Sequence, residues 1–481
     1  MEHIIKNVIS RLNTADIQFA DVRITITDNE GINFVNGHLR GYQSSLGSPA
    51  MGVRVLINGC WGFAGSKDLS STSIDKMIKT AKSNAIQGSH FLKEKVSFPS
   101  LPATIAEYHH QPKINPFTMP REEKMDYLGK LATSIAPKGK IVHSYVEGEF
   151  MRQEKYYANT EGSYSHTSYY NTLPLMMVVA ADSGQVQSRT WPGHMSAGRG
   201  GFELFYEQQF AENTDRILKE AMDLLSAPTI TEEKADIIIG NGHLALQLHE
   251  SVGHATEADR IFGMEISYAG KTFVKPEMLG NFQYGSPILN IYSDSTDPKG
   301  LGYHPMDDEG VPGKKIDIIR DGVLVNQQTS RRIAHALGLE PSSNMKGSYA
   351  DDFPLVRMTN LCIAPGKGSL ADLILATENG YLLDFTKTWS IDDNRNNFQF
   401  TTEIGYKIKD GHIVGIVKEP TYFGITKDFW NACDAICGTE DWGYFSTFHC
   451  GKGEPGQVMQ LSHGVAPARF KDINVSVKMQ H

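Results

Sequence analysis

Cysteine is scarce in this sequence, with five residues scattered along a chain of 481. An odd and widely spaced set gives no disulfide framework, which favours a reducing compartment. Long apolar runs are also missing, because the longest, 173–181, is too short to cross a bilayer. The N-terminal segment reads as an amphipathic helix with charges throughout, unlike a secretory signal. We therefore predict a soluble, cytoplasmic protein with no membrane partner.

Basic runs are absent as well, and the formal net charge is −9. A protein without a basic patch is a poor ligand for a polyanion, so we expect no direct nucleic-acid partner. The sequence has no G-x-S-x-G elbow, which disfavours a serine hydrolase. Gly240-Asn241-Gly242 follows a strand-like run but lacks the G-x-G-x-x-G spacing of a dinucleotide-binding turn.

What the chain does contain is a compact group of metal-binding residue types. A short apolar strand is predicted over 235–239, and after the glycine turn a helix is predicted over 243–252. Inside it lies His249-Glu250-Ser251-Val252-Gly253-His254. Neutral imidazole nitrogens are zinc ligands, and a neighbouring carboxylate can take a proton from metal-bound water. The segment therefore predicts a hydrolytic zinc site.

The spacing of the two histidines is unusual. They are five residues apart, whereas the H-E-x-x-H motif places them four apart on one helix face. In an ideal helix five residues separate two side chains by roughly 140°, too far for one metal ion. Either a π-type turn brings them together, or Gly253 ends the helix and His254 folds back.

The stretch HESVGH followed by ATEADR resembles the metal motif of the TldD/PmbA family of metallopeptidases, some members of which are labelled modulators of DNA gyrase. The resemblance extends over nearly the whole chain, because further stretches fit the family: Gly52-Val53-Arg54-Val55, Asn159-Thr160-Glu161-Gly162, Asp308-Glu309-Gly310, Arg357-Met358-Thr359-Asn360 and Cys450-Gly451-Lys452-Gly453. One branch of the family carries H-E-x-x-x-H and a paralogous branch lacks it. This chain is similar to the motif-carrying, TldD-like branch.

A catalytic zinc site usually has three protein ligands and one open position. The candidate for the third ligand is Cys450, since the glycines after it allow close backbone approach. The resemblance implies the same assignment: Zn2+ held by His249, His254 and Cys450, with Glu250 as general base and acid.

Several other residues of suitable type allow further interpretations. Cys433 and Cys437 lie four apart on a helix predicted over 426–436, and with His449 and Cys450 they could form a separate structural zinc site. Glu257 and Asp259 match acidic positions of the family, and either they orient a ligand or they form a solvated acidic turn. We interpret His243 as structural.

The predicted fold class is α+β with two domains. Residues 1–227 form a mixed α/β domain with antiparallel hairpins, suited to a peptide channel or to dimerisation. Residues 228–481 form a β-rich metallopeptidase domain that carries the metal-site helix. Asn36-Gly37 and Asn58-Gly59 predict type I′ turns, residues 20–27 alternate like a half-buried strand, and further helices are predicted over 205–225 and 330–337.

The function implied by the resemblance is a zinc-dependent metallopeptidase that cleaves unstructured peptides, including leader peptides. It also implies a dimer, either of two such chains or of one chain and a motif-less TldE/PmbA-like paralogue. Two alternatives stay open: a non-catalytic scaffold subunit of a TldD/TldE-type assembly, and a zinc amidohydrolase that acts on small amides.

Overall fold

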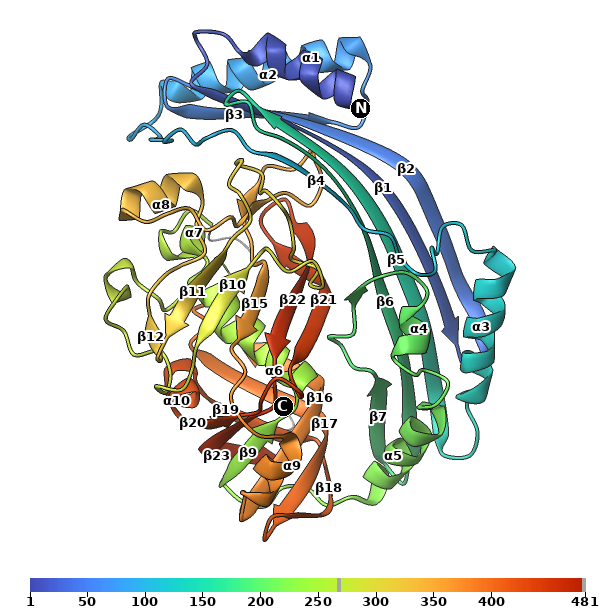
Figure 1. Cartoon of the computed structure of the whole chain (residues 1–481). Coiled ribbons are helices and arrows are strands. Elements are labelled where there is room, and N and C mark those ends of the chain that lie inside the picture. Colours follow the sequence, from blue (N-terminus) through green and yellow to red (C-terminus); the bar gives the residue numbers. More distant parts are fainter. Residues whose placement is uncertain (266–269, 478–481) are drawn as a thin grey trace.

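The computed structural model describes residues 1–265 and 270–477. It is an α+β protein with antiparallel sheets and a β-rich C-terminal region, as predicted (Figure 1). A long curved sheet made by the N-terminal half runs as a band beside the C-terminal half (Figure 1).

The N-terminal sheet has eight strands in the order β3-β2-β1-β5-β6-β4, with β7 and β8 also paired to β6. Only β4 runs parallel to its neighbour. Asn36 and Gly37 have φ values of 53° and 80°, and Asn58 and Gly59 have values of 52° and 76°, so both predicted type I′ turns are confirmed. The strands are β1 (Phe19–Val35), β2 (His38–Ile57), β3 (Cys60–Ser66), β4 (Ile105–His109), β5 (Ile141–Asn159), β6 (Tyr164–Asp182), β7 (Gln185–Trp191) and β8 (Gly198–Arg199).

Helices cover this sheet in two groups. Near one end, α1 (Glu2–Leu12) and α2 (Ser71–Ser89) bury their apolar faces against β1 and β2. Toward the other end lie α3 (Arg121–Ser134), α4 (Leu204–Glu207) and α5 (Thr214–Ser226). The single helix predicted over 205–225 is wrong, because Gln209 has a left-handed φ of 54° that interrupts it.

The C-terminal half contains a small β-barrel. Strand β16 pairs with both β9 and β17, so five strands close in the order β16-β9-β23-β19-β17. The closed strands are β16 (Asn379–Ile391), β9 (Lys234–Ile239), β23 (Ala468–Val477), β19 (Pro420–Ile425) and β17 (Asn397–Lys409); β18 (His412–Lys418) and β20 (Cys433–Ile436) attach to them. The helix predicted over 426–436 is therefore wrong beyond α10 (Thr426–Asn431), because the following residues pair with β23.

A second sheet stands beside the barrel and has the strand order β12-β11-β10-β15-β22-β21. Its strands are β10 (Ile291–Asp294), β11 (Lys315–Arg320), β12 (Val323–Leu324), β15 (Asn360–Ile363), β21 (Gly443–Lys452) and β22 (Gln457–Val465). The pair β13 (Met345–Lys346) and β14 (Leu355–Val356) lies apart from it. Helices α6 (Asn241–Leu248), α7 (Ala258–Ile261), α8 (Arg331–Leu337) and α9 (Leu370–Leu375) complete this half. The predicted helix over 330–337 is confirmed, with Ser330 as its N-cap and Gly338 as a left-handed C-cap.

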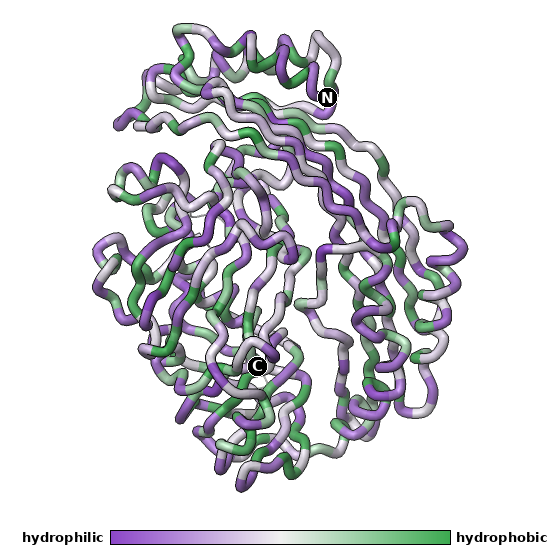
Figure 2. Tube along the Cα trace, viewed as in Figure 1, coloured by the Kyte–Doolittle hydropathy of each residue, from purple (hydrophilic) through white to green (hydrophobic). Residues whose placement is uncertain are grey.

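The two halves meet through buried charges on β1 and β2. Hydrophilic and hydrophobic residues alternate along the long strands (Figure 2), as the pattern over 20–27 predicts. The half-buried interpretation is nevertheless wrong, because the polar residues Asp21, Arg23, Thr25 and Thr27 are at most 2% exposed. Arg23 lies 3.4 Å from Asp308, and Arg54 lies 3.4 Å from Glu309, both in the C-terminal half. The polar face is thus covered by protein and not by water.

Among the helices of the described residues, none is long and apolar enough to cross a membrane.

Candidate metal centre

The metal motif lies on a helix that changes its winding. Strand β9 ends at Ile239, and Gly240 follows because a Cβ there would lie 2.6 Å from the Asp384 carboxyl group. Helix α6 then runs to Leu248, and His249–Gly253 forms a π-helical turn. Of the two arrangements that the spacing allows, the structure has the π-turn.

Gly253 closes this turn against the neighbouring sheet. A Cβ at this position would lie 2.2 Å from Sδ of the buried Met358, so a larger residue would displace the turn or the methionine. Helix α6 itself is anchored by His243, whose Nδ1 lies 2.7 Å from Thr386 Oγ1 inside the barrel. The structural role predicted for His243 therefore agrees with its contacts.

Three soft donor atoms converge at the end of the π-turn. Cys450 Sγ, from β21, lies 3.4 Å from His249 Nε2 and 3.7 Å from His254 Nε2. One possible ligand atom from each residue lies within 4.8 Å of the others, and all three residues are buried. Within residues 1–265 and 270–477 this is the one group of three or more His, Cys, Asp or Glu side chains close enough to share an ion.

The alternative cysteine site does not assemble. Cys433 and Cys437 are buried in and just after β20, and no group with His449 forms among the described residues. His449 instead pairs with Glu149 of β5 at 3.2 Å.

A chain of hydrogen bonds sets the protonation of both histidines. His463 Nδ1 lies 3.2 Å from the Leu361 carbonyl, which can only accept, so His463 Nε2 carries the lone pair. His249 Nδ1, 2.8 Å from that Nε2, must then be the donor. His254 Nδ1 donates in the same way to Glu257 Oε2 over 3.0 Å. Both Nε2 atoms therefore keep their lone pairs and direct them toward Cys450 Sγ.

The electrostatics of the three donors suit a cation. Burial lowers the pKa of His249 to about 4 and also lowers that of His254, so both are neutral ligands at pH 7. Burial opposes ionisation of Cys450, but the charge of Arg357 favours the thiolate, and the pKa of the thiol is lowered. Two neutral nitrogens and a thiolate-forming sulfur match the donor set of a tetrahedral zinc site, and the residues fit this metal.

The acidic positions after the motif have different contacts. Besides His254, Glu257 contacts Arg260 at 2.7 Å and Lys452 at 3.2 Å, whereas Asp259 contacts Lys452 at 2.8 Å. Burial would raise the pKa of Glu257, but Lys452 and then His254 and Arg260 hold it well below its usual range. Glu257 is therefore a carboxylate that orients His254 directly, and Asp259 acts on the centre only through Lys452.

Glu250, which directly follows the metal-binding candidate His249, forms an ion pair with an arginine. Its Oε2 contacts Nη1 of Arg395, which lies at the tip of the hairpin between β16 and β17. The two side chains are 12% and 8% exposed. Arg395 and His463 are not predictable from the sequence, because they lie 145 and 214 residues from their partners and no motif marks them.

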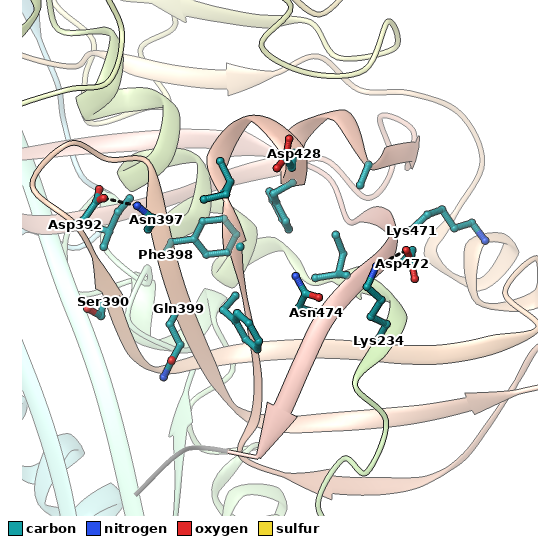
Figure 3. Close-up of a pocket in the computed structure, with 17 residues that line it drawn as sticks. Lys234, Ser390, Asp392, Asn397, Phe398, Gln399, Asp428, Lys471, Asp472 and Asn474 are labelled. Carbon is teal, nitrogen blue, oxygen red and sulfur yellow. Dashed lines mark hydrogen bonds and ion pairs between the residues drawn. The ribbon is translucent and has the colours of Figure 1, made fainter. Parts of the chain in front are cut away.

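Cys450 lies on the face of β21 opposite to the N-terminal sheet of its own chain. His449 points to β5, and its neighbour Cys450 points to the opposite face of β21. A groove of about 720 Å³ lies at one end of the barrel (Figure 3). Asp392 and Asn397, which flank Arg395 and are joined by a hydrogen bond in Figure 3, line one edge of this groove.

Comparisons with known proteins find relatives over nearly the whole chain. The model of the PmbA/TldA metallopeptidase C-terminal domain matches residues 232–477, and the model of domain 1 of the same family matches residues 20–85. A metalloprotease of Methanothermobacter thermautotrophicus is 28% identical over 95% of this chain and 95% of its own. A zinc metalloprotease TldD homolog of Saccharolobus solfataricus is 26% identical over 95% of this chain and 96% of its own.

Two solved structures share the fold. A putative modulator of a DNA gyrase from Thermotoga maritima has a TM-score of 0.77 at 20% identity, covering 99% of this chain and 100% of that one. TldE from Thermococcus kodakarensis has a TM-score of 0.72 at 16% identity, covering 98% of this chain and 100% of that one.

Proposed function

The chain belongs to the PmbA/TldD metallopeptidase family, and on that premise we propose that it is a zinc-dependent peptidase acting on unstructured peptides. The observation that carries this proposal is the convergence of His249 Nε2, His254 Nε2 and Cys450 Sγ beside Glu250. Three ligands leave a tetrahedral ion one open position, which is the arrangement of catalytic and not of structural zinc sites.

In this proposal His249, His254 and Cys450 hold the ion, which when bound supplies a Lewis acid and an acidified water. One thiolate lowers the formal charge of such a site to about +1, so removal of the water proton depends strongly on Glu250. Glu250 takes that proton and returns it to the leaving amine nitrogen. Glu257 and His463 keep the two imidazoles in the tautomer that can bind a metal.

The substrate class follows from the way the site would be enclosed. The donors are buried within the chain, on the side of β21 opposite to the chain's own N-terminal sheet, so in this proposal the body that encloses the substrate beside them is a second chain. We propose a homodimer or a heterodimer with a motif-less paralogue, in which residues 1–227 serve dimerisation or form a peptide channel and residues 228–481 carry the centre. An enclosed site admits an extended peptide, whereas a folded substrate must first lose roughly 5–15 kcal/mol of stability. The five buried, unpaired cysteines suit a reducing cytoplasm.

Metal analysis combined with a peptide-library digest tests this function. We expect about one zinc per chain, from the three-ligand arrangement, and cleavage of disordered peptides but not of a stably folded protein. Cleavage of small amides without cleavage of peptides would favour a zinc amidohydrolase instead. Zinc without hydrolysis of either substrate would favour a scaffold subunit.

Sedimentation tests the assembly. A dimer is expected, either of the chain alone or after addition of a motif-less paralogue. A monomer that still digests peptides would contradict the enclosed site.

A further inference from the structure

Arg395 forms a buried ion pair with the residue to which we assign the proton transfer. We propose that Arg395 is a catalytic residue whose guanidinium binds the carbonyl oxygen of the scissile peptide bond as that oxygen becomes negative. This inference rests on the proposed peptidase function and adds a residue to it.

The charge balance of the buried Arg395–Glu250 pair favours this role. Arg395 Nη1 contacts Glu250 Oε2, and with 8% and 12% exposure neither side chain is well solvated. A buried cation needs an anion beside it. During hydrolysis Glu250 gains a proton and becomes neutral, so its pairing with Arg395 is lost in that step. A negative charge appears in the same step on the carbonyl oxygen of the substrate, and that oxygen is the natural replacement partner.

The step balances with the residues present. The water oxygen forms a bond to the carbonyl carbon, the carbonyl π electrons move to the carbonyl oxygen, and one water proton moves to Glu250. When the C–N bond breaks, the electron pair returns to re-form the carbonyl, and the Glu250 proton goes to the leaving nitrogen. Arg395 gains and loses nothing covalently, because a guanidinium stays protonated in proteins. Its contribution is a fixed positive charge with oriented N–H groups.

The backbone that carries Arg395 is held in an unusual conformation. Its φ is 60°, in the left-handed region that side chains other than glycine rarely adopt. The turn is held by hydrogen bonds from Arg395 N to Asp392 O, 2.9 Å, and from Asn397 Nδ2 to Asp392 Oδ2, 2.7 Å. The buried Thr426 donates its hydroxyl to Arg395 O over 2.8 Å. Such strain in an over-determined turn is typical of functional positions.

The same turn is tied to the metal motif. Phe273 N donates to Asn394 O over 2.6 Å, and the adjacent Thr272 donates its hydroxyl to Ala255 O over 2.8 Å. Ala255 directly follows His254, so a short hydrogen-bonded path joins the histidine to the turn of the arginine. This path connects the turn that carries Arg395 to the residue after the metal-binding candidate His254.

Arginine suits this role better than lysine. A guanidinium carries five N–H donors in a planar fork, so it can hold a carboxylate and a second oxygen at the same time. A lysine ammonium offers a point charge without that geometry. Because a thiolate ligand weakens the polarising charge of the centre, a second cation at the carbonyl oxygen compensates for it.

Arg395→Met and Arg395→Lys test the inference against a matched control. The control is Arg469→Met, which removes a partly buried arginine–aspartate pair, with Asp434, elsewhere in the C-terminal half. Three quantities are measured for each variant: zinc content, kcat and KM on the library peptide that the wild type cleaves fastest, and calorimetric binding of the phosphinic analogue of that peptide. The phosphinic group is tetrahedral and anionic, and it mimics the oxygen that we assign to Arg395.

For Arg395→Met we expect unchanged zinc, a kcat lowered by about 100-fold or more, and phosphinic binding weakened to a similar degree, as for the loss of one oxyanion donor. KM should change less than about threefold, because the contact is made mainly in the transition state. Arg395→Lys should recover part of the loss, and Arg469→Met should match the wild type.

Two kinds of result would overturn the assignment. Loss of zinc or a large fall in Tm in both Arg395 variants would show that the arginine has a structural role and not a catalytic one. Unchanged binding of the phosphinic analogue, or a KM that rises as much as kcat falls, would show that Arg395 makes no contact specific to the transition state. The proposed peptidase function would stand in either case. A wild-type protein that cleaves no peptide would instead refute the proposed function, and this inference with it.

Discussion

His463 offers the sharpest test of how the centre is held. It is fully buried, donates to the Leu361 carbonyl and accepts from His249 Nδ1 over 2.8 Å. In His463→Leu the acceptor disappears while the side-chain volume is nearly kept. His249 then has two possible tautomers. In one the proton stays on Nδ1 without a partner, and in the other it is on Nε2, where it replaces the lone pair that binds the metal.

The size of the effect follows from either tautomer. An unsatisfied buried donor costs about 1–3 kcal/mol, which is a factor of about 5–150 in an equilibrium constant. Loss of a partner that orients a metal-binding histidine typically lowers metal affinity 10–100-fold, in the same range. We therefore expect the zinc dissociation constant of His463→Leu to rise about 5- to 150-fold. His463→Gln, whose amide oxygen can accept the same hydrogen bond, should stay near the wild type.

Competition with a fluorescent zinc chelator measures the zinc dissociation constant of each variant directly. A thermal melt of each metal-free protein shows whether a change in affinity comes from a change in folding. If His463→Leu binds zinc as tightly as the wild type, the hydrogen-bond chain does not set the tautomer of His249. If His463→Gln loses as much affinity as His463→Leu, the imidazole itself matters and not the hydrogen bond.

Three further variants separate ligands, chemistry and packing. Cys450→Ala should lose most of its zinc because only two ligands remain, and full zinc content would exclude Cys450 as a ligand. Glu250→Gln should keep zinc and fold but lose at least ~100-fold in turnover, so a normally active variant would contradict the mechanism. Gly253→Ala should lower stability by about 1–3 kcal/mol in a denaturant titration, because its Cβ would lie 2.2 Å from Met358 Sδ. Gly242→Ala, on the same helix with its nearest atom at 3.8 Å, is the control, and equal stability of the two variants would contradict the packing argument.

Local sequence predicted the centre of the site well and its surroundings poorly. The histidine spacing predicted a π-turn as one of two solutions, and the resemblance pointed to Cys450, which the structure brings beside both histidines. Arg395 and His463 lie far along the chain and carry no periodic signal, so only tertiary structure brings them to the motif.

The errors in the predicted fold have the same physical origin. Alternation along 20–27 gave the correct strand, but a local pattern cannot tell whether the polar face meets water or the charges of another region, as Arg23 meets Asp308. The helix predicted beyond Asn431 has apolar residues at helical spacing, yet Cys433–Ile436 pair with β23 because the barrel supplies a strand edge. Tertiary pairing outweighs local propensity in such short segments.

The barrel closure determines when the centre can form during synthesis. Cys450 follows His254 by 196 residues, and β23, which pairs with β9 just before α6, is made later still. At about 5–20 residues per second a ribosome needs roughly 10–40 s to pass from the second histidine to the cysteine. During that interval the nascent chain presents two histidines but no third donor. A growing and still unfolded chain, the kind of polypeptide that we assign as substrate, therefore never carries its own complete hydrolytic centre.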